Sequence, residues 1–439
     1  MTFNRKAALR RFLSPVALAA VASLGVAGVS TPALAQKKDK KEAAAPKANY
    51  SKGFVAAYQP VMTMVNAENT DLAAARAALP GLIAASETPD DKMATGRIIF
   101  TVGQKAKDFP LALQGIEMVL ASGKADQTTT GQFAFVGGQI AYNQKDYAKA
   151  RTMIQQAIAA GYTENNPELI LADSYFSENK YAEGLKYLSD TIDARKAAGQ
   201  AVEEAWVKRG LAMALNAKLD EDARKWGMIY ARDYPSQTSW GDAVAVVINS
   251  GRYAPAEMLD VLRLARATNT LRSRAMYLEY VDAADPRKLP SEVSAVLDAG
   301  VEAKMIDPTL QLVKDARATA TSRIADDKTE LPSLERDAGA ASAKLVTVMA
   351  AADTMLSYGK YAEAEKFYEK AAGLPGANLP LVMTRQGIAE VNQGKWDEAK
   401  ASFAKVTGDR KPIADLWALY AAQKAVGTVI APATTSATG

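Results

Sequence analysis

The chain has 439 residues, 49% of them hydrophobic, and it contains neither cysteine nor histidine. These absences exclude nucleophilic sites that pair serine or cysteine with histidine, and zinc sites built on cysteine or histidine ligands. The 53 basic and 49 acidic residues nearly balance, so the chain lacks the strongly basic character typical of nucleic-acid-binding proteins.

The first 35 residues predict a secretory signal peptide. A basic segment opens the chain and contains Arg5, Lys6, Arg10 and Arg11. An apolar run follows, and Ala33 and Ala35 place small residues where a signal peptidase reads them. We expect cleavage after Ala35 and a periplasmic location, with an uncleaved membrane anchor as the alternative. Beyond this leader no apolar run is long enough to span a bilayer, so no transmembrane segment is expected in the mature chain.

Residues 36–49 and 429–439 are predicted to be a disordered linker and a disordered tail, because large apolar residues are scarce in both. Between them alanine, leucine, lysine and glutamate dominate, and alternating strand-like patterns are rare. The pattern therefore predicts an all-α protein whose helices are joined by short turns.

One short pattern recurs at a spacing in the mid-thirties of residues. An aromatic residue is followed three positions later by alanine or glycine, at Tyr147 and Ala150, Tyr181 and Gly184, Tyr361 and Ala364, and Trp396 and Ala399. A second small residue precedes each aromatic by nine positions, at Gly138, Ala172, Ala352 and Gly387. A fixed period of this length is typical of a solenoid of helical hairpins, in which small residues allow two helices to approach closely.

These positions resemble the tetratricopeptide repeat, a family of helical hairpins with small residues at two fixed positions and an aromatic at a third. The resemblance implies a tetratricopeptide-like α-solenoid. We predict N-terminal repeats over residues 50–270, an irregular helical connector over 271–340, and C-terminal repeats over 341–428. Within the connector we expect helices at 272–283, 290–304 and 308–324 and a new helix start at 331–335. A closing helix at 412–427 would cap the last repeat.

The resemblance also implies a binding groove, because the first helix of each hairpin lines the concave face in this family. The corresponding positions in the two best central units are Gln132, Phe135, Gln139, Tyr142, Asn166, Leu169, Asp173 and Phe176. Aromatic side chains beside neutral polar groups favour a peptide or glycan over a polyanion. The alternative is that Tyr142 and Phe176 only complete the hydrophobic core of their hairpins.

No residue is predicted to be catalytic, to bind a metal or to hold a cofactor. The conspicuous acidic residues lie at expected helix starts, where the helix dipole accounts for them. We therefore predict a non-catalytic exported scaffold that binds a protein or peptide partner in the cell envelope. The alternative function is a glycan-binding accessory protein of polysaccharide export or cell-wall metabolism.

Overall fold

A computed structural model describes residues 48–68 and 70–433. The predicted signal peptide, nearly all of the predicted linker and the end of the predicted tail lie outside this part of the chain. Within it the protein is all-α, and the only β interaction is an isolated bridge between Ser236 and Ala431. Contacts divide the chain into two compact units, the first ending at Ala201 and the second beginning at Val202.

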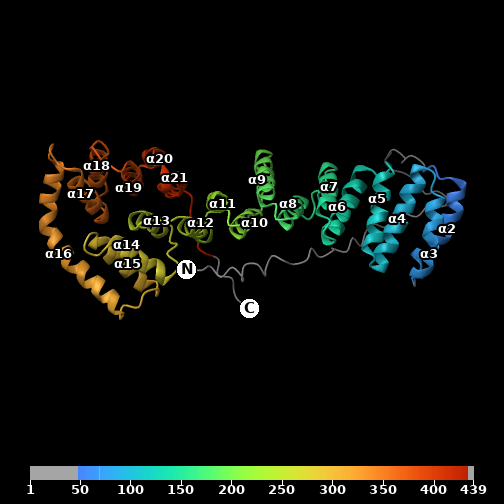
Figure 1. The fold of residues 1–439 in the computed structure, drawn as a ribbon, viewed down its shortest axis with the longest axis horizontal. Coiled ribbons are helices and arrows are strands. Elements are labelled where there is room, and N and C mark those ends of the chain that lie inside the picture. Colours follow the sequence, from blue (N-terminus) through green and yellow to red (C-terminus); the bar gives the residue numbers. More distant parts are fainter. Residues whose placement is uncertain (1–47, 69, 434–439) are drawn as a thin grey trace, which may run out of the picture. The chain divides into compact units, whose positions relative to one another are not determined.

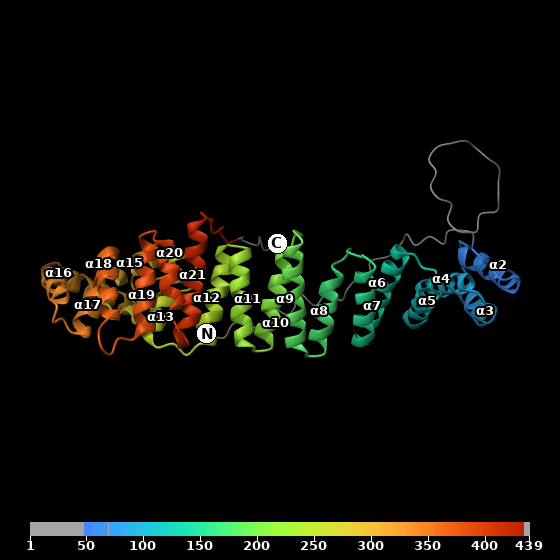
Figure 2. The same ribbon diagram turned by 90° about the horizontal axis from the view of Figure 1, so that it is seen from above.

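Unit 1 is a row of antiparallel helical hairpins (Figures 1 and 2). Its helices are α2 (Lys52–Asn66), α3 (Leu72–Ala84), α4 (Pro89–Ala106), α5 (Phe109–Ala121), α6 (Gln127–Asn143), α7 (Tyr147–Ala159), α8 (Pro167–Ser177) and α9 (Tyr181–Ala197). The predicted aromatic residues Tyr147 and Tyr181 are the first residues of α7 and α9.

The small residues of the repeat lie where two helices touch. A Cβ atom on Gly138 would lie 2.6 Å from the Ile154 side chain of α7, and one on Gly184 would lie 2.5 Å from the Phe176 ring of α8. Both distances are shorter than any normal contact, so a larger residue would force the helices apart. The predicted reason for the small residues is therefore confirmed.

Unit 2 contains the remaining helices in two runs. The first run is α10 (Glu204–Asn216), α11 (Asp220–Asp233), α12 (Gln237–Ser250), α13 (Pro255–Ala267), α14 (Arg274–Ala284), α15 (Pro290–Glu302) and α16 (Gln311–Gly339). The second run is α17 (Leu345–Ser357), α18 (Tyr361–Ala372), α19 (Leu379–Asn392), α20 (Trp396–Ala404), the 3-10 turn η1 (Gly408–Arg410) and α21 (Lys411–Ala425).

The second run turns back onto the first. Helix α21 packs against α11, α12 and α13, and α19 packs against α13 (Figure 1). Trp240 of α12 is fully buried, and its indole N–H donates to Gln423 Oε1 of α21 at 3.1 Å. The predicted closing helix thus exists, but it also joins two parts of unit 2 that are far apart in sequence.

The connector differs from the sequence prediction in one element. Helix α16 continues through Pro332 to Gly339, so the predicted helix start at 331–335 and the predicted end at 324 are wrong. Proline costs the helix one backbone hydrogen bond. Arg323 pairs with Asp327 at 2.6 Å and with Glu330 at 3.0 Å, which supports the turn before the proline. Leu331 and Leu334 on either side pack against the unit 2 core.

Candidate functional site

The four predicted groove residues of α6 divide between the surface and the core. Gln132 and Tyr142 are partly exposed, whereas Phe135 and Gln139 are buried at 3% and 7% exposure. The Phe135 ring stacks on Tyr162, with ring centroids 4.6 Å apart. Phe135 and Gln139 therefore support the hairpin from inside and are not presented to a ligand.

The residues predicted from the α8 region divide in the same way. Asn166, Leu169 and Asp173 are partly exposed, and Phe176 is buried beside Gly184 of α9. For Phe176 the structure thus agrees with the alternative interpretation, in which the ring completes the hairpin core.

Helices α6 and α8 contact each other, and the partly exposed members lie on these two helices and at the N-cap of α8. Tyr142 Oη lies 3.0 Å from Ser177 Oγ at the end of α8, and the Tyr142 ring makes an edge contact with Tyr147. We call this surface the first-helix face. It consists of Gln132, Tyr142, Asn166, Leu169 and Asp173. It combines one aromatic, one aliphatic, one acidic and two amide side chains on rigid helices, a composition able to bind a peptide by hydrogen bonds and apolar contact.

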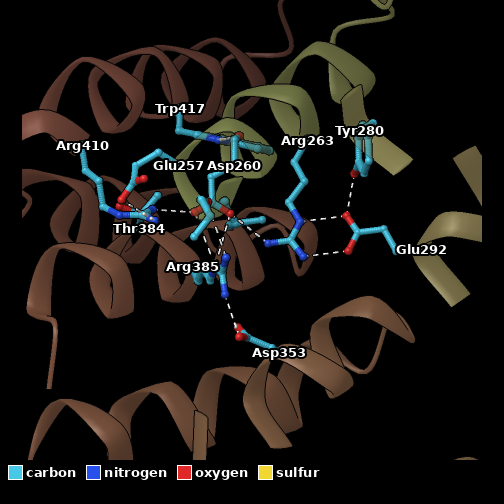
Figure 3. Close-up of polar contacts among 12 residues, drawn as sticks. Glu257, Asp260, Arg263, Tyr280, Glu292, Asp353, Thr384, Arg385, Arg410 and Trp417 are labelled. Atoms are coloured by element: carbon cyan, nitrogen blue, oxygen red, sulfur yellow. Dashed lines mark hydrogen bonds and ion pairs between the residues drawn. The ribbon is translucent and has the colours of Figure 1, made fainter. Parts of the chain in front are cut away.

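Unit 2 holds a second polar cluster, which the sequence analysis did not predict (Figure 3). Asp260 of α13 is fully buried and accepts hydrogen bonds from three arginines. Arg263 Nη1 lies 2.9 Å and Arg385 Nε 3.3 Å from Asp260 Oδ1, and Arg410 Nη1 lies 2.6 Å from Oδ2. The Trp417 indole N–H donates to the Asp260 backbone oxygen at 2.9 Å.

Further carboxylates surround these arginines. Glu292 of α15 accepts two hydrogen bonds from Arg263, at 2.8 and 2.7 Å, and one from Tyr280 Oη at 2.5 Å. Asp353 of α17 accepts from Arg385 Nη1 at 2.7 Å, and Glu257 lies 3.3 Å from Arg410 Nη2. We call the whole set, centred on Asp260, the Asp260 cluster.

The electrostatics of the Asp260 cluster indicate a structural role. Burial alone would raise the pKa of Asp260, but the charges of Arg385, Arg263 and Arg410 outweigh it and lower this pKa. The pKa of Glu292 is lowered too, because Arg263 outweighs the effect of burial. A carboxylate that is held charged, saturated by arginines and removed from solvent is a poor proton acceptor and is out of reach of a substrate. The Asp260 cluster joins α13 to α15, α19 and η1.

Sequence reasoning missed this cluster for a clear reason. Only Asp260 and Arg263 are close in the sequence, and Arg385 and Arg410 come from elements more than a hundred residues later. One usable signal was Arg385, which follows apolar residues Val382 and Met383 and lies on a helix that is buried almost all round. A charge in such a position requires a buried partner.

Residues 48–68 and 70–433, which the structure describes, contain neither a candidate membrane span nor a candidate metal site. No helix there is both long and apolar enough to cross a membrane. No three acidic side chains lie close enough to hold a metal ion within those same residues.

Comparisons with known proteins gave structural matches alone. No family model matches the chain, and no curated protein matches it. Similar solved structures include the Naa15/Naa10 complex bound to HypK-THB (14% identity, TM-score 0.39, 84% of this chain and 60% of that one). A second is the APC/C hetero-tetramer Cut9–Hcn1, with 13% identity and a TM-score of 0.24 over 73% of this chain and 66% of that one. A third is the pentatricopeptide repeat protein PPR10 from maize, with 15% identity and a TM-score of 0.32 over 87% of this chain and 54% of that one.

The chain spans less than two thirds of the length of each of these proteins. The fold follows from the hairpins themselves, with an aromatic at the start of each second helix and small residues where the paired helices touch. The chain has a tetratricopeptide-like α-solenoid fold.

Proposed function

We propose that this protein is a non-catalytic, exported repeat scaffold that binds a protein or peptide partner through the first-helix face of unit 1. The observation that carries the proposal is the composition of this face. Tyr142 and Leu169 offer apolar contact beside the polar groups of Gln132 and Asp173, and all four belong to helices whose packing fixes them.

The arrangement of aromatic side chains favours a peptide over a glycan. Sugars stack on flat aromatic rings that are open to solvent. Phe135 and Phe176 are buried, and Tyr142 is covered in part by its edge contact with Tyr147. The first-helix face therefore offers one aromatic side chain and no stacking platform.

Export to the periplasm is the second part of the proposal, and it rests on the sequence of the leader. Mass spectrometry of the protein recovered from a periplasmic extract should give an N-terminus at Gln36, after removal of the first 35 residues. Recovery of the intact leader in a membrane fraction would contradict cleavage.

The binding proposal is tested by capturing partners from an envelope extract on the mature chain and then measuring the affinity of the captured partner. The variant Asp173→Lys reverses one charge on the first-helix face. The matched control, Glu183→Lys, makes the same change on an exposed position of α9. Glu183 is exposed and Asp173 is only partly exposed, so the helical spectrum and unfolding midpoint of each variant are measured before the affinities are compared.

We expect Asp173→Lys to weaken binding and Glu183→Lys to leave it unchanged. Equal affinities for the two variants, with normal helical spectra, would place the contact elsewhere. The non-catalytic part is tested with purified peptidoglycan, from which the mature chain should release no soluble fragments.

A further inference from the structure

Residues 428–433 form a short extended segment that lies against the start of α12. We call it the C-terminal strap. The Ala431 N–H donates to Pro235 O at 3.1 Å, and the Gln237 N–H donates to Ala431 O at 2.7 Å. This pairing makes the isolated parallel bridge between Ser236 and Ala431. Ala431 alone therefore pairs with both the backbone oxygen of Pro235 and the backbone N–H of Gln237 at the start of α12.

The strap leaves α21 from a fixed point. Gly427 adopts a positive φ of 71°, which ends the helix and turns the chain. The Thr428 N–H then donates to Gln423 O at 2.9 Å. Gln423 itself is buried, and its side-chain amide donates to Ala231 O of α11 at 2.8 Å. The base of the strap is thus held firmly against α11 and α12.

Beyond its base the strap is held by few contacts. Ile430 packs its side chain against the unit 2 core and stays partly exposed, whereas Val429 is 79% exposed. Pro432 has no N–H, so the backbone pairing cannot continue past Ala431. The Ala433 N–H donates to Gln237 Oε1 at 3.2 Å at an exposed position. A segment with two ladder hydrogen bonds, this third hydrogen bond and one anchoring side chain is held weakly enough to be displaced.

A cavity of about 310 Å³ lies beside the strap and is open to solvent. Its walls are the end of α13, the end of α21 and the strap itself, formed by Gln237, Ala267, Thr268, Asn269, Lys424, Gly427, Thr428, Val429 and Ile430. Val429 of the strap lines this cavity and is 79% exposed, so its side chain leaves most of the space open. A longer side chain at that position has room to enter, and the Lys424 ammonium favours an acidic one.

From these contacts we propose that the start of α12 and the adjoining cavity form a docking site for an extended peptide segment of a partner protein, and that the C-terminal strap occupies this site in its absence. The ligand would pair its backbone with Pro235 O and the Gln237 N–H, as a strand added to an edge does. It would carry an apolar side chain at the Ile430 position and an acidic side chain one residue earlier. This site lies within unit 2 and is independent of the first-helix face of unit 1.

The test uses the full chain and a labelled peptide with the strap sequence Thr-Val-Ile-Ala-Pro-Ala, followed by fluorescence anisotropy. Ile430→Asp releases the strap by placing a charge at its apolar anchor. Ala431→Pro is a second release variant. It removes the N–H that donates a hydrogen bond to Pro235 O, and it changes only an exposed residue. The tethered strap competes at a high effective concentration, so the peptide should bind the parent at least about tenfold more weakly than either release variant.

Gln237 provides the control on the site itself. It is the first residue of α12, a position where proline is well tolerated, so Gln237→Pro removes the N–H donor and keeps the helix. Gln237→Ala keeps that donor. In an Ile430→Asp background Gln237→Ala loses only the side-chain oxygen that accepts from the Ala433 N–H, whereas Gln237→Pro also loses the backbone donor. We therefore expect Gln237→Pro to bind the peptide about 3- to 10-fold more weakly than Gln237→Ala, as the loss of one further hydrogen bond implies.

Hydrogen exchange gives a readout that needs no peptide. The Gln237 amide should exchange slowly in the parent and faster in both release variants. The proposal is overturned if both release variants fail to bind the peptide, if the parent binds it equally well, or if Gln237→Pro binds as tightly as Gln237→Ala.

Discussion

Glu390 of α19 is a buried carboxyl group that forms no ion pair with any residue that the structure describes. The side chain is 2% exposed, and its Oε1 atom accepts from Gln386 Nε2 at 2.9 Å and from Ser402 Oγ at 3.1 Å. Its Oε2 atom has no hydrogen-bond partner among the described residues. Burial raises the pKa of Glu390, and the nearby charges of Glu365 and Glu369 raise it further.

This raised pKa predicts that Glu390 lowers the free energy of unfolding in a pH-dependent way. The folded state holds the Glu390 proton to a higher pH than the unfolded state does. The stabilisation from the protonated form is therefore lost as pH rises from the ordinary carboxyl range through the raised pKa. We predict that Glu390→Gln stabilises unit 2 by about 1–2 kcal/mol at pH 8, because a neutral amide replaces a buried charge, and by less at pH 5.

Urea unfolding at the two pH values measures this difference. The exposed Glu335→Gln change in α16 is the control and should leave stability nearly unchanged at both. An effect of Glu390→Gln that is the same at pH 5 and pH 8 would show that Glu390 has an ordinary pKa.

At the scale of the element, the contact between α19 and α20 depends on residue size. Ala399 of α20 is fully buried, and Gly387 of α19 lies so close to the Phe403 ring that a Cβ there would be 2.5 Å from it. We predict that Ala399→Leu destabilises the protein by about 1–3 kcal/mol through overpacking.

The matched control is Ala401→Leu, two residues later on the exposed side of the same helix. It adds the same side-chain atoms and should leave the free energy of unfolding almost unchanged. Thermal unfolding of the two variants compares them directly, and equal melting temperatures would mean that the repeat register of α20 is misassigned.

The elements were predictable where their signals are local. The positions of Tyr147, Tyr181, Tyr361 and Trp396 gave the starts of four second helices, because each aromatic lies at a fixed distance from its small partner residue. Helix α16 was not predictable at Pro332, since local sequence indicates a break and tertiary packing of Leu331 and Leu334 overrides it.

The exposure of the predicted groove residues could be anticipated only in part from the sequence. Family positions placed Gln132, Tyr142, Leu169 and Asp173 on α6 and α8, where they are partly exposed. The same positions did not reveal that Phe135 and Gln139 are buried, because burial depends on how the neighbouring helices pack. A substitution of Gln139 would therefore perturb the hydrophobic core as well as the binding of any ligand.

For the molecule as a whole, the packing of α19 and α21 against α13 makes unit 2 more than an open row of neighbouring hairpins. In an open solenoid each repeat contacts only the next one. In unit 2 the Asp260 cluster ties together elements that a hundred or more residues separate. We therefore expect unit 2 to unfold as one cooperative body.

Replacement of the central carboxylate tests this expectation. Asp260→Asn would leave Arg385 and Arg410 buried with too little negative charge, so we predict a loss of about 3–5 kcal/mol in the free energy of unfolding. Glu257→Gln removes a partly exposed carboxylate from the rim of the same cluster and should cost less than about 1 kcal/mol. Similar losses for the two variants would show that the Asp260 cluster does not hold unit 2 closed.

Hydroxyl-radical footprinting of the complex with the captured partner determines whether the partner binds the first-helix face. Binding should reduce the oxidation of Tyr142 and Leu169, which lie partly exposed on α6 and α8. Phe109, which is 39% exposed at the start of α5, serves as the reference and should oxidise equally with and without the partner. Undiminished oxidation of Tyr142 and Leu169 in a saturated complex would show that the partner does not bind the first-helix face.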